Sequence, residues 1–231
     1  MPLTPPALAV FDLETTGVDV ATARIVTAYV GVMGVDGSLV ASRSWLADPG
    51  VEIPAGAAAI HGVTTERARA EGRPAATVVR EIVDELASRS ADGLPLVVYN
   101  APYDLTLLKH EAKRHHAGPF VPPPVVIDPL VIDKAVDRYR KGKRTLEAAC
   151  AHYGVALDGA HDASVDAIGA GHVARAIITR YADELPATLT ELHAQQARWH
   201  QQQADSFESW MRASKDQNFT ADRGWPLRQS A

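Results

Sequence analysis

The sequence predicts an α/β fold in which a mixed β-sheet is flanked by helices and followed by a C-terminal helical extension. Three observations support this prediction. The chain opens with three apolar segments, continues with alternating strand-like and helix-like segments, and is 46% hydrophobic over 231 residues. That composition is normal for a protein with a core, and the length allows one large domain or one domain with a modest appendage.

The first three strands are predicted to form an antiparallel meander. Residues 7–11 are a short apolar run of small and β-branched residues, which is typical of a buried strand. Residues 24–32 predict a longer second strand, and residues 39–46 predict a third. Between these two, Val35-Asp36-Gly37-Ser38 has the composition of a tight turn, so we expect consecutive strands to be neighbours.

Helices and strands then alternate, which is the pattern of a sheet covered by helices. Residues 74–88 predict a helix because their apolar side chains recur on one face. Strands at 94–99 and 125–127 bring the predicted sheet to five strands. Further helices are predicted over residues 102–114, 145–152 and 163–182, with another after Asp128-Pro129, a cap followed by proline at the first helical position.

The chain changes character at Pro186. Residues 187–214 are polar and helix-prone with sparse apolar anchors, and residues 215–231 have little periodicity. We therefore divide the chain into a domain over 1–185 and an extension over 186–231. The extension has too few apolar residues to form its own core. We expect it to pack against the domain, a second copy of the chain or a partner such as a DNA polymerase.

The charge of the chain limits the kind of ligand it can hold. A net charge of −5 argues against a broad grip on duplex nucleic acid, but it is compatible with holding a short single-stranded end. One cationic cluster has two interpretations, a solvated helix end and loop or a phosphate-binding patch. Its members are Lys134, Arg138, Arg140, Lys141, Lys143 and Arg144.

The remaining composition favours a cytoplasmic protein. The single cysteine, Cys150, lies in an apolar helical stretch, so we expect it to pack in the core rather than to form a disulfide. We find neither a segment of membrane-spanning length nor the pattern of a leader, and we expect no membrane contact.

Two carboxylates come directly after the first predicted strand. Asp12 and Glu14 are two residues apart, so their side chains point to the same face of an extended chain. Like charges this close repel each other unless a cation lies between them, and Mg²⁺ or Mn²⁺ prefers oxygen ligands. The pair therefore predicts a divalent metal site, and a polar loop after an edge strand is the alternative.

Two later segments supply further acid and base groups. Asp104 is predicted in the first turn of a helix at a strand's carboxyl end, where ligands of open sheets gather, although an acid there also stabilises the helix dipole. His161 precedes an apolar helix that Asp162 would cap, and Asp166 lies about one turn further on. A histidine and a carboxylate so placed can flank one point, with one group binding metal and the other handling protons.

Together these motifs resemble a known enzyme family. Asp12-x-Glu14-Thr15-Thr16-Gly17, Asn100-x-x-x-Asp104 and His161-Asp162-Ala163-x-x-Asp166 occur in the order that the DEDDh (DnaQ-like) 3′–5′ exonuclease family has. The segment Ile60-His61-Gly62-Val63-Thr64 also resembles a signature of that family. The resemblance covers about residues 7–182 and leaves the extension uncovered.

The resemblance implies both a fold and a chemistry. It implies a ribonuclease H-like sheet and two Mg²⁺ or Mn²⁺ ions held by Asp12, Glu14, Asp104 and Asp166, with His161 as the general base. It also implies that Thr15, Thr16, His61 and Asn100 lie near the terminal nucleotide. The expected reaction is 3′–5′ release of nucleoside 5′-monophosphates from single-stranded ends, in DNA proofreading or repair.

Other functions stay open at this point. RNA 3′-end trimming uses the same five residues. A haloacid-dehalogenase-type phosphohydrolase has an Asp-x-Asp-x-Thr motif, but Glu14 is one methylene too long for it, and that enzyme has no need of Asp104 or His161. A non-catalytic nucleic-acid-binding module would be expected to have lost an acid or the histidine.

Overall fold

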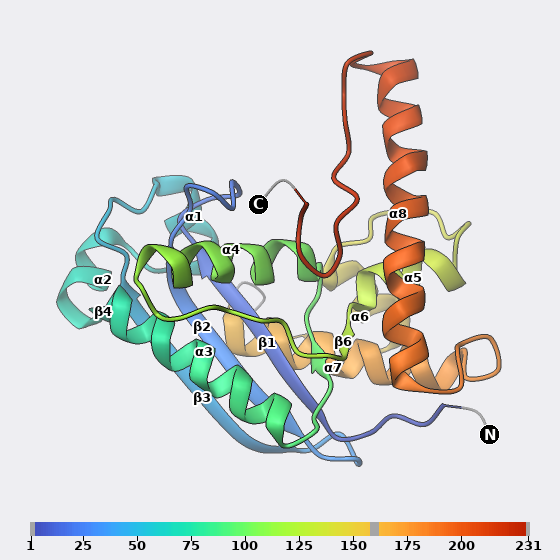
Figure 1. The fold of residues 1–231 in the computed structure, drawn as a ribbon, viewed down its shortest axis with the longest axis horizontal. Coiled ribbons are helices and arrows are strands. Elements are labelled where there is room, and N and C mark those ends of the chain that lie inside the picture. The colour runs from blue at the N-terminus through green and yellow to red at the C-terminus, as the bar shows by residue number, and fades with distance from the viewer. Residues whose placement is uncertain (1–2, 158–161, 230–231) are drawn as a thin grey trace.

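A computed structural model of the chain describes residues 3–157 and 162–229. Within these residues the centre is a six-stranded sheet in the order β4-β3-β2-β1-β5-β6 (Figure 1). The strands are β1 (Leu8–Thr15), β2 (Ile25–Met33), β3 (Leu39–Asp48), β4 (Arg73–Pro74), β5 (Leu96–Val97) and β6 (Val126–Ile127). The first three are antiparallel, and β5 and β6 continue the sheet parallel to β1. The predicted mixed sheet flanked by helices is therefore confirmed.

The sheet has one strand more than the five predicted. β4 consists of two residues and pairs in parallel with the last two residues of β3. A segment this short carries no periodicity, so its sequence gives no strand signal. Gly72 allows the approach, since a Cβ there would lie 2.6 Å from the backbone nitrogen of Asp48 and would overlap the carbonyl oxygen of Ala68.

β1 runs through the two carboxylates that we expected to follow it. Instead of ending at residue 11, the strand continues to Thr15, and Asp12 and Glu14 pair with Tyr29 and Thr27 of β2. The reason is that the antiparallel ladder is made by backbone groups, which hydrogen-bond whatever the side chain is. The acids are therefore fixed on the sheet itself rather than on a loop.

Side-chain alternation decides which face of the sheet carries the acids. Phe11 and Leu13 of β1 belong to one hydrophobic core, and Leu8 and Val10 belong to the other. Because successive side chains point to opposite faces, positions 12 and 14 continue the row of Leu8 and Val10. This is the face that helix α7 (Ala163–Arg180) covers.

Helices cover both faces of the sheet (Figure 1). α3 (Ala75–Ala91) and α4 (Ala101–Arg114) pack on the face of Phe11, whereas α5 (Pro129–Val136), α6 (Leu146–Tyr153) and α7 belong to the core of Val10. α7 lies close to β1, and Gly171 permits this approach. A Cβ at this position would be only 2.7 Å from Val10 Cγ1. Cys150 of α6 is 1% exposed, which confirms that it packs in the core.

Two short helices between β3 and α3 were not predicted. α1 (Ala55–His61) and α2 (Thr65–Glu71) have seven residues each, and no residue of α1 is buried. A helix without a buried face has no apolar periodicity to reveal it. His61, the last residue of α1, is followed by Gly62 in the left-handed conformation at φ 74°.

The extension contains one long helix and an irregular tail, as predicted. α8 (Leu189–Ser214) starts with a capping box between Thr188 and Glu191, and its second half stands away from the rest of the molecule (Figure 1). The tail returns beside the helix to the body, where Trp225 and Leu227 pack against the core of Phe11.

α8 also completes the edge of the sheet at β6. His193 Nδ1 accepts a hydrogen bond from the Val126 amide at 3.0 Å. The fully buried Gln196 donates to the Val126 carbonyl at 2.9 Å and accepts from the Asp128 amide at 2.7 Å. An open strand edge would leave these backbone groups unpaired.

Along the described chain, no helix combines the length and apolarity needed to cross a bilayer.

Candidate active site

Three carboxylates from two elements converge on the α7 face of β1. Oxygen atoms of Asp12, Glu14 and Asp166 all lie within 4.8 Å of one another. The strand supplies the first two through its two-residue alternation, and α7 supplies Asp166 from its first turn. Asp162 caps this helix by accepting a hydrogen bond from the Ser164 amide at 2.8 Å, which confirms the predicted cap.

Asp104 joins the three acids from α4. It is 4% exposed, and its Oδ1 accepts a hydrogen bond from the Leu13 amide at 3.2 Å. It is not one of the three whose oxygens lie within 4.8 Å, but it lines the same hollow as Asp12, Glu14 and Asp166. All four predicted acids therefore face one space, which we call the acid hollow. The other residues that line it are Leu13, Tyr99, Asn100, Tyr103, Leu130, Arg144, Thr145 and Leu146.

Burial, and after it the charges of neighbouring acids, raises the pKa values of these carboxyl groups. Burial and then the charges of Asp104, Glu14 and Asp166 raise the pKa of Asp12 well above its usual range. Burial also raises the pKa of Asp104, and burial followed by the charge of Asp166 raises the pKa of Glu14 to about 8. A cation among the carboxylates would offset this repulsion. The all-oxygen donor set fits Mg²⁺ or Mn²⁺ rather than a softer metal.

A second hollow shares Glu14 with the acid hollow. It also contains His61, Arg67 and Asp162. We call it the His61 hollow. Burial lowers the pKa of the His61 imidazole, whose Nδ1 accepts a hydrogen bond from the Val63 amide at 3.2 Å.

The two predicted threonines are held by the protein beside these hollows. The Thr15 hydroxyl lies 2.5 Å from the Tyr103 hydroxyl, which in turn donates to the Gly17 carbonyl at 2.5 Å. Thr16 is 9% exposed, and its hydroxyl accepts from the Arg24 amide at 2.9 Å. Neither threonine lines either hollow, whereas Asn100 lines the first and His61 the second. His161 lies outside the described residues, and its role stays a prediction.

Asp128 holds the acid hollow together, a role that the sequence did not reveal. Its buried carboxylate accepts hydrogen bonds from the amides of Asn100, Ala101 and Leu130, each at 3.0 Å. The capping of α5 by Asp128 was predicted. The bonds to the start of α4 were not, because Asn100 lies 28 residues before Asp128 and no pattern in the nearby sequence indicates the contact. These bonds support Asn100 in the left-handed conformation, φ 65°.

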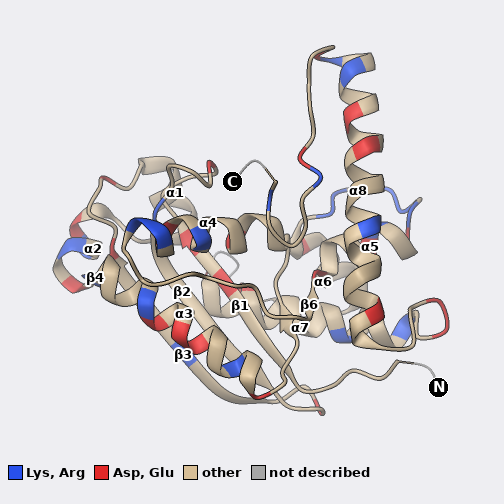
Figure 2. Cartoon of the chain, in the orientation of Figure 1, with Lys and Arg blue, Asp and Glu red and all other residues tan. Residues whose placement is uncertain are grey.

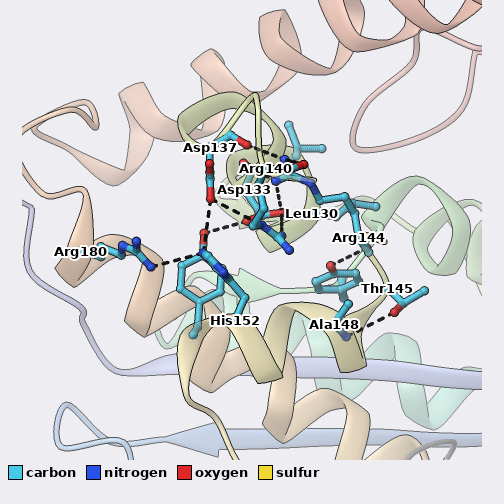
Figure 3. A network of polar contacts seen from close by, with 12 residues as sticks. Leu130, Asp133, Asp137, Arg140, Arg144, Thr145, Ala148, His152 and Arg180 are labelled. Carbon is cyan, nitrogen blue, oxygen red and sulfur yellow. Dashed lines mark hydrogen bonds and ion pairs between the residues drawn. The ribbon is translucent and has the colours of Figure 1, made fainter. Parts of the chain in front are cut away.

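The cationic cluster divides into partly buried members, Arg140 and Arg144, and exposed ones. Figure 2 shows where Lys and Arg lie along the chain. Arg140 and Arg144 donate to Asp133 Oδ2 at 2.5 and 2.7 Å, and Arg144 also donates to the Asp137 carbonyl at 2.5 Å. Figure 3 shows this network between α5 and α6. These two arginines therefore hold the connecting segment in place. The phosphate-binding interpretation now applies to the exposed members, Lys134, Arg138, Lys141 and Lys143.

Tyr99 links this network to the acid hollow. Its hydroxyl donates to the Arg144 carbonyl at 2.8 Å, and both residues line the hollow. Their sequence positions alone gave no indication of this contact.

Comparisons with known proteins identify a matching family and a sequence relative. The exonuclease family model of the RNase T type matches residues 9–173. A DNA polymerase III subunit epsilon-like protein of Rhodobacter capsulatus is 33% identical over 112 residues, which are 48% of this chain and 15% of that protein.

Solved structures of exonuclease I share the fold. An Escherichia coli exonuclease I structure with a dT13 oligonucleotide has a TM-score of 0.66 at 19% identity, over 78% of this chain and 42% of that one. The enzyme of Methylocaldum szegediense has a TM-score of 0.60 at 20% identity, over 76% of this chain and 41% of that one. The chain thus spans less than half the length of each of these relatives.

Proposed function

The chain belongs to the DEDDh (DnaQ-like) exonuclease family, and from this premise we propose that it is a metal-dependent 3′–5′ exonuclease acting on single-stranded DNA ends. The observation that carries the proposal is the convergence of Asp12, Glu14 and Asp166 within 4.8 Å, with Asp104 on the same hollow. The products are nucleoside 5′-monophosphates.

The four acids would hold two Mg²⁺ or Mn²⁺ ions. Such a pair would supply an activated water and would stabilise negative charge on the leaving 3′-oxygen. The chain's own part is to fix the carboxylates, two through the ladder of β1 and one each through α4 and α7. His161 would accept the proton of the attacking water.

The two hollows suggest how a strand end is held. A scissile phosphate at the acids has the terminal nucleoside on one side and the preceding nucleotide on the other. Glu14 lines both spaces, so they adjoin at this side chain. We place the terminal nucleoside in the His61 hollow, with Asn100 facing the bond to be cleaved. Thr15 and Thr16 then support the wall between the sites through their contacts with Tyr103 and Arg24.

DNA is the proposed substrate because one relative is a DNA polymerase III subunit epsilon-like protein and the Escherichia coli exonuclease I structure was solved with a DNA oligonucleotide. RNA trimming is the second candidate, and it shares all five catalytic positions. The family match removes support from the haloacid-dehalogenase alternative. A binding module without catalysis is the remaining contrast, and an activity assay separates it.

The test is hydrolysis of matched DNA and RNA oligonucleotides, single-stranded and duplex, carrying a 5′ label. We expect single-stranded DNA to shorten stepwise in Mg²⁺, and a 3′-phosphate to stop the reaction because the blocked end no longer enters the site. Cleavage that ignores the 3′-phosphate would show an endonuclease. Faster shortening of RNA than of DNA would show that RNA is the preferred substrate.

A second test concerns the base. His161→Ala should lower turnover about 10²–10⁴-fold while the dissociation constant for Mn²⁺ stays unchanged. His61→Ala is the matched control in the neighbouring hollow. We expect it to raise the Michaelis constant more than it lowers turnover. Unchanged turnover in His161→Ala would remove this histidine from the mechanism.

A further inference from the structure

We propose that a groove between α8 and the α5–α6 segment holds the part of a single-stranded nucleic acid that precedes the cleaved nucleotide. The groove has a volume of about 920 Å³. This inference rests on the proposed function, because it takes the acid hollow as the point of cleavage. The residues that line the groove are Lys134, Ala135, Arg138, Arg140, Arg144, Trp199, Gln202, Gln203, Ser206, Phe207 and Trp210.

One wall of the groove is positively charged. The charged side chains among its described lining residues are all cationic, although the chain carries a net charge of −5. Arg140 and Arg144 are paired with Asp133, but Lys134 and Arg138 are exposed, and Lys141 continues the exposed series along the segment. Figure 2 shows Lys and Arg gathered there. A row of exposed cations suits the phosphates of an extended strand.

The other wall carries exposed aromatic rings. Phe207 and Trp210 of α8 are 49% and 50% exposed, and their rings are stacked with centroids 5.9 Å apart and an interplanar angle of 24°. The Lys215 ammonium lies 5.0 Å from the centre of the Trp210 ring. Two adjacent exposed rings give unpaired bases a flat surface on which to stack.

The combination of the two walls decides between ligands. A cationic wall alone fits any polyanion, and an apolar ridge alone fits a protein surface. Cations on one side and exposed rings on the other match a single strand, whose phosphates follow one wall while its unpaired bases stack on the other. A duplex hides its base faces and has no use for the aromatic wall.

The groove leads to the acid hollow. Arg144 lines both spaces, so they adjoin at this residue. A strand whose cleaved bond lies at Asp12 would thus continue past Arg144 towards Phe207 and Trp210. The extension then contributes to substrate binding from outside the catalytic residues, and affinity grows with strand length.

The test is binding without hydrolysis. Fluorescein-labelled oligothymidylates of roughly 4 and roughly 20 nucleotides, lengths that bracket known single-strand site sizes, are titrated in EDTA. Phe207→Ala with Trp210→Ala should weaken binding of the long oligonucleotide about tenfold, with a smaller effect on the short one. Arg138→Gln with Lys141→Gln should reduce the steepness of its salt dependence. Arg80→Gln on α3, in the opposite helical layer, is the control and should change neither.

A second aromatic variant separates stacking from apolar docking. Phe207→Leu with Trp210→Leu keeps an apolar surface without flat rings and should be as weak as the alanine pair. Three results would contradict the proposal. They are full affinity in the leucine pair, equal losses of affinity for the long and the short oligonucleotide, and unchanged affinity in every variant. A fourth is light scattering in which the parent is a dimer and the alanine pair a monomer while binding of the long oligonucleotide is unaltered, since the face would then hold a second copy.

The same proteins separate this inference from the proposed function. Length-dependent binding that the groove variants weaken, without any shortening of the strand in Mg²⁺, would support the groove and contradict the nuclease. Shortening of the strand together with variants that bind as the parent does would support the nuclease and contradict the groove.

Discussion

The buried carboxylate of Asp128 accepts a hydrogen bond from the backbone amide of Asn100 at 3.0 Å, across the carboxyl ends of β5 and β6. Asn100 is in the left-handed conformation, which asparagine tolerates better than most residues other than glycine. The bond, together with that to Ala101, fixes the start of α4 and with it the position of Asp104. A residue outside the four predicted acids thus positions one of them.

Asp128→Asn should disturb this arrangement, because the amide nitrogen of asparagine cannot accept a hydrogen bond from a backbone amide. We expect a loss of about 1–3 kcal/mol in the free energy of unfolding and a lower turnover. Asp36→Asn, at an exposed turn where the carboxylate accepts from the Ser38 amide at 2.9 Å, is the matched control. Denaturant titration and turnover would measure both effects. A variant as stable and active as the parent would show that Asp104 does not depend on Asp128.

The acid hollow should make the metal-free protein less stable as pH rises. The folded-state pKa of Glu14 is raised from 4.5 to about 8, and that of Asp12 is raised as well. Between pH 4.5 and about 8 the folded chain keeps a proton on Glu14 that the unfolded chain has released. The free energy of unfolding therefore falls as pH rises through this range. In EDTA the melting temperature of the parent should therefore fall from pH 5 to pH 8.

Mg²⁺ should reverse this fall, and it should raise the melting temperature more at pH 8 than at pH 5, because bound metal needs ionised carboxylates. Glu14→Gln removes one titrating group and should show a smaller fall in EDTA. Glu66→Gln, at an exposed position on α2, is the control and should follow the parent. An equal effect of Mg²⁺ at both pH values would contradict a metal site in the acid hollow.

The two kinds of cation in the cluster should behave differently when neutralised. Arg140→Gln leaves Asp133, whose side chain is fully buried, with one ion-pair partner fewer, so we expect a loss of about 2 kcal/mol in stability. Lys141→Gln, on an exposed neighbouring residue, should change stability by less than about 0.5 kcal/mol. Urea denaturation of the two variants makes the comparison. Equal stability would show that the pairing with Asp133 contributes little.

The division of the chain at residue 185 stays a prediction with a direct test. We propose that a chain ending at Leu185 retains metal-dependent activity on short single strands, because the four acids and His161 all precede that point. It should unfold at a lower temperature, because the Val126 and Asp128 backbone groups lose Gln196. A truncated chain that is folded by circular dichroism but inactive on every substrate would make the extension part of the catalytic core.

The local part of the site could be predicted from the sequence. Asp12 and Glu14 reveal themselves by their two-residue spacing after an apolar run, and the Asp162 cap by its position before an apolar helix. These signals lie within a few residues of one another. The same holds for the meander, whose strands carry their own periodicity.

The non-local part could not be predicted in the same way. The bonds from Asp128 to the start of α4, and from Gln196 to β6, join segments that only the fold brings together. From its sequence position Arg140 looks like an ordinary surface charge, but in the fold it forms an ion pair with the buried Asp133. Strand β4 left no trace, because two residues are too few for a pattern.

The most direct test of the central claim, that the four carboxylates form a metal-dependent nuclease site, is stepwise shortening of a 5′-labelled single-stranded DNA oligonucleotide. With Mg²⁺ the parent should release one nucleoside 5′-monophosphate at a time. Excess chelator should abolish the reaction, and so should Asp12→Ala, even though this variant should remain folded by circular dichroism. Full activity in excess chelator, or in Asp12→Ala, would contradict the account.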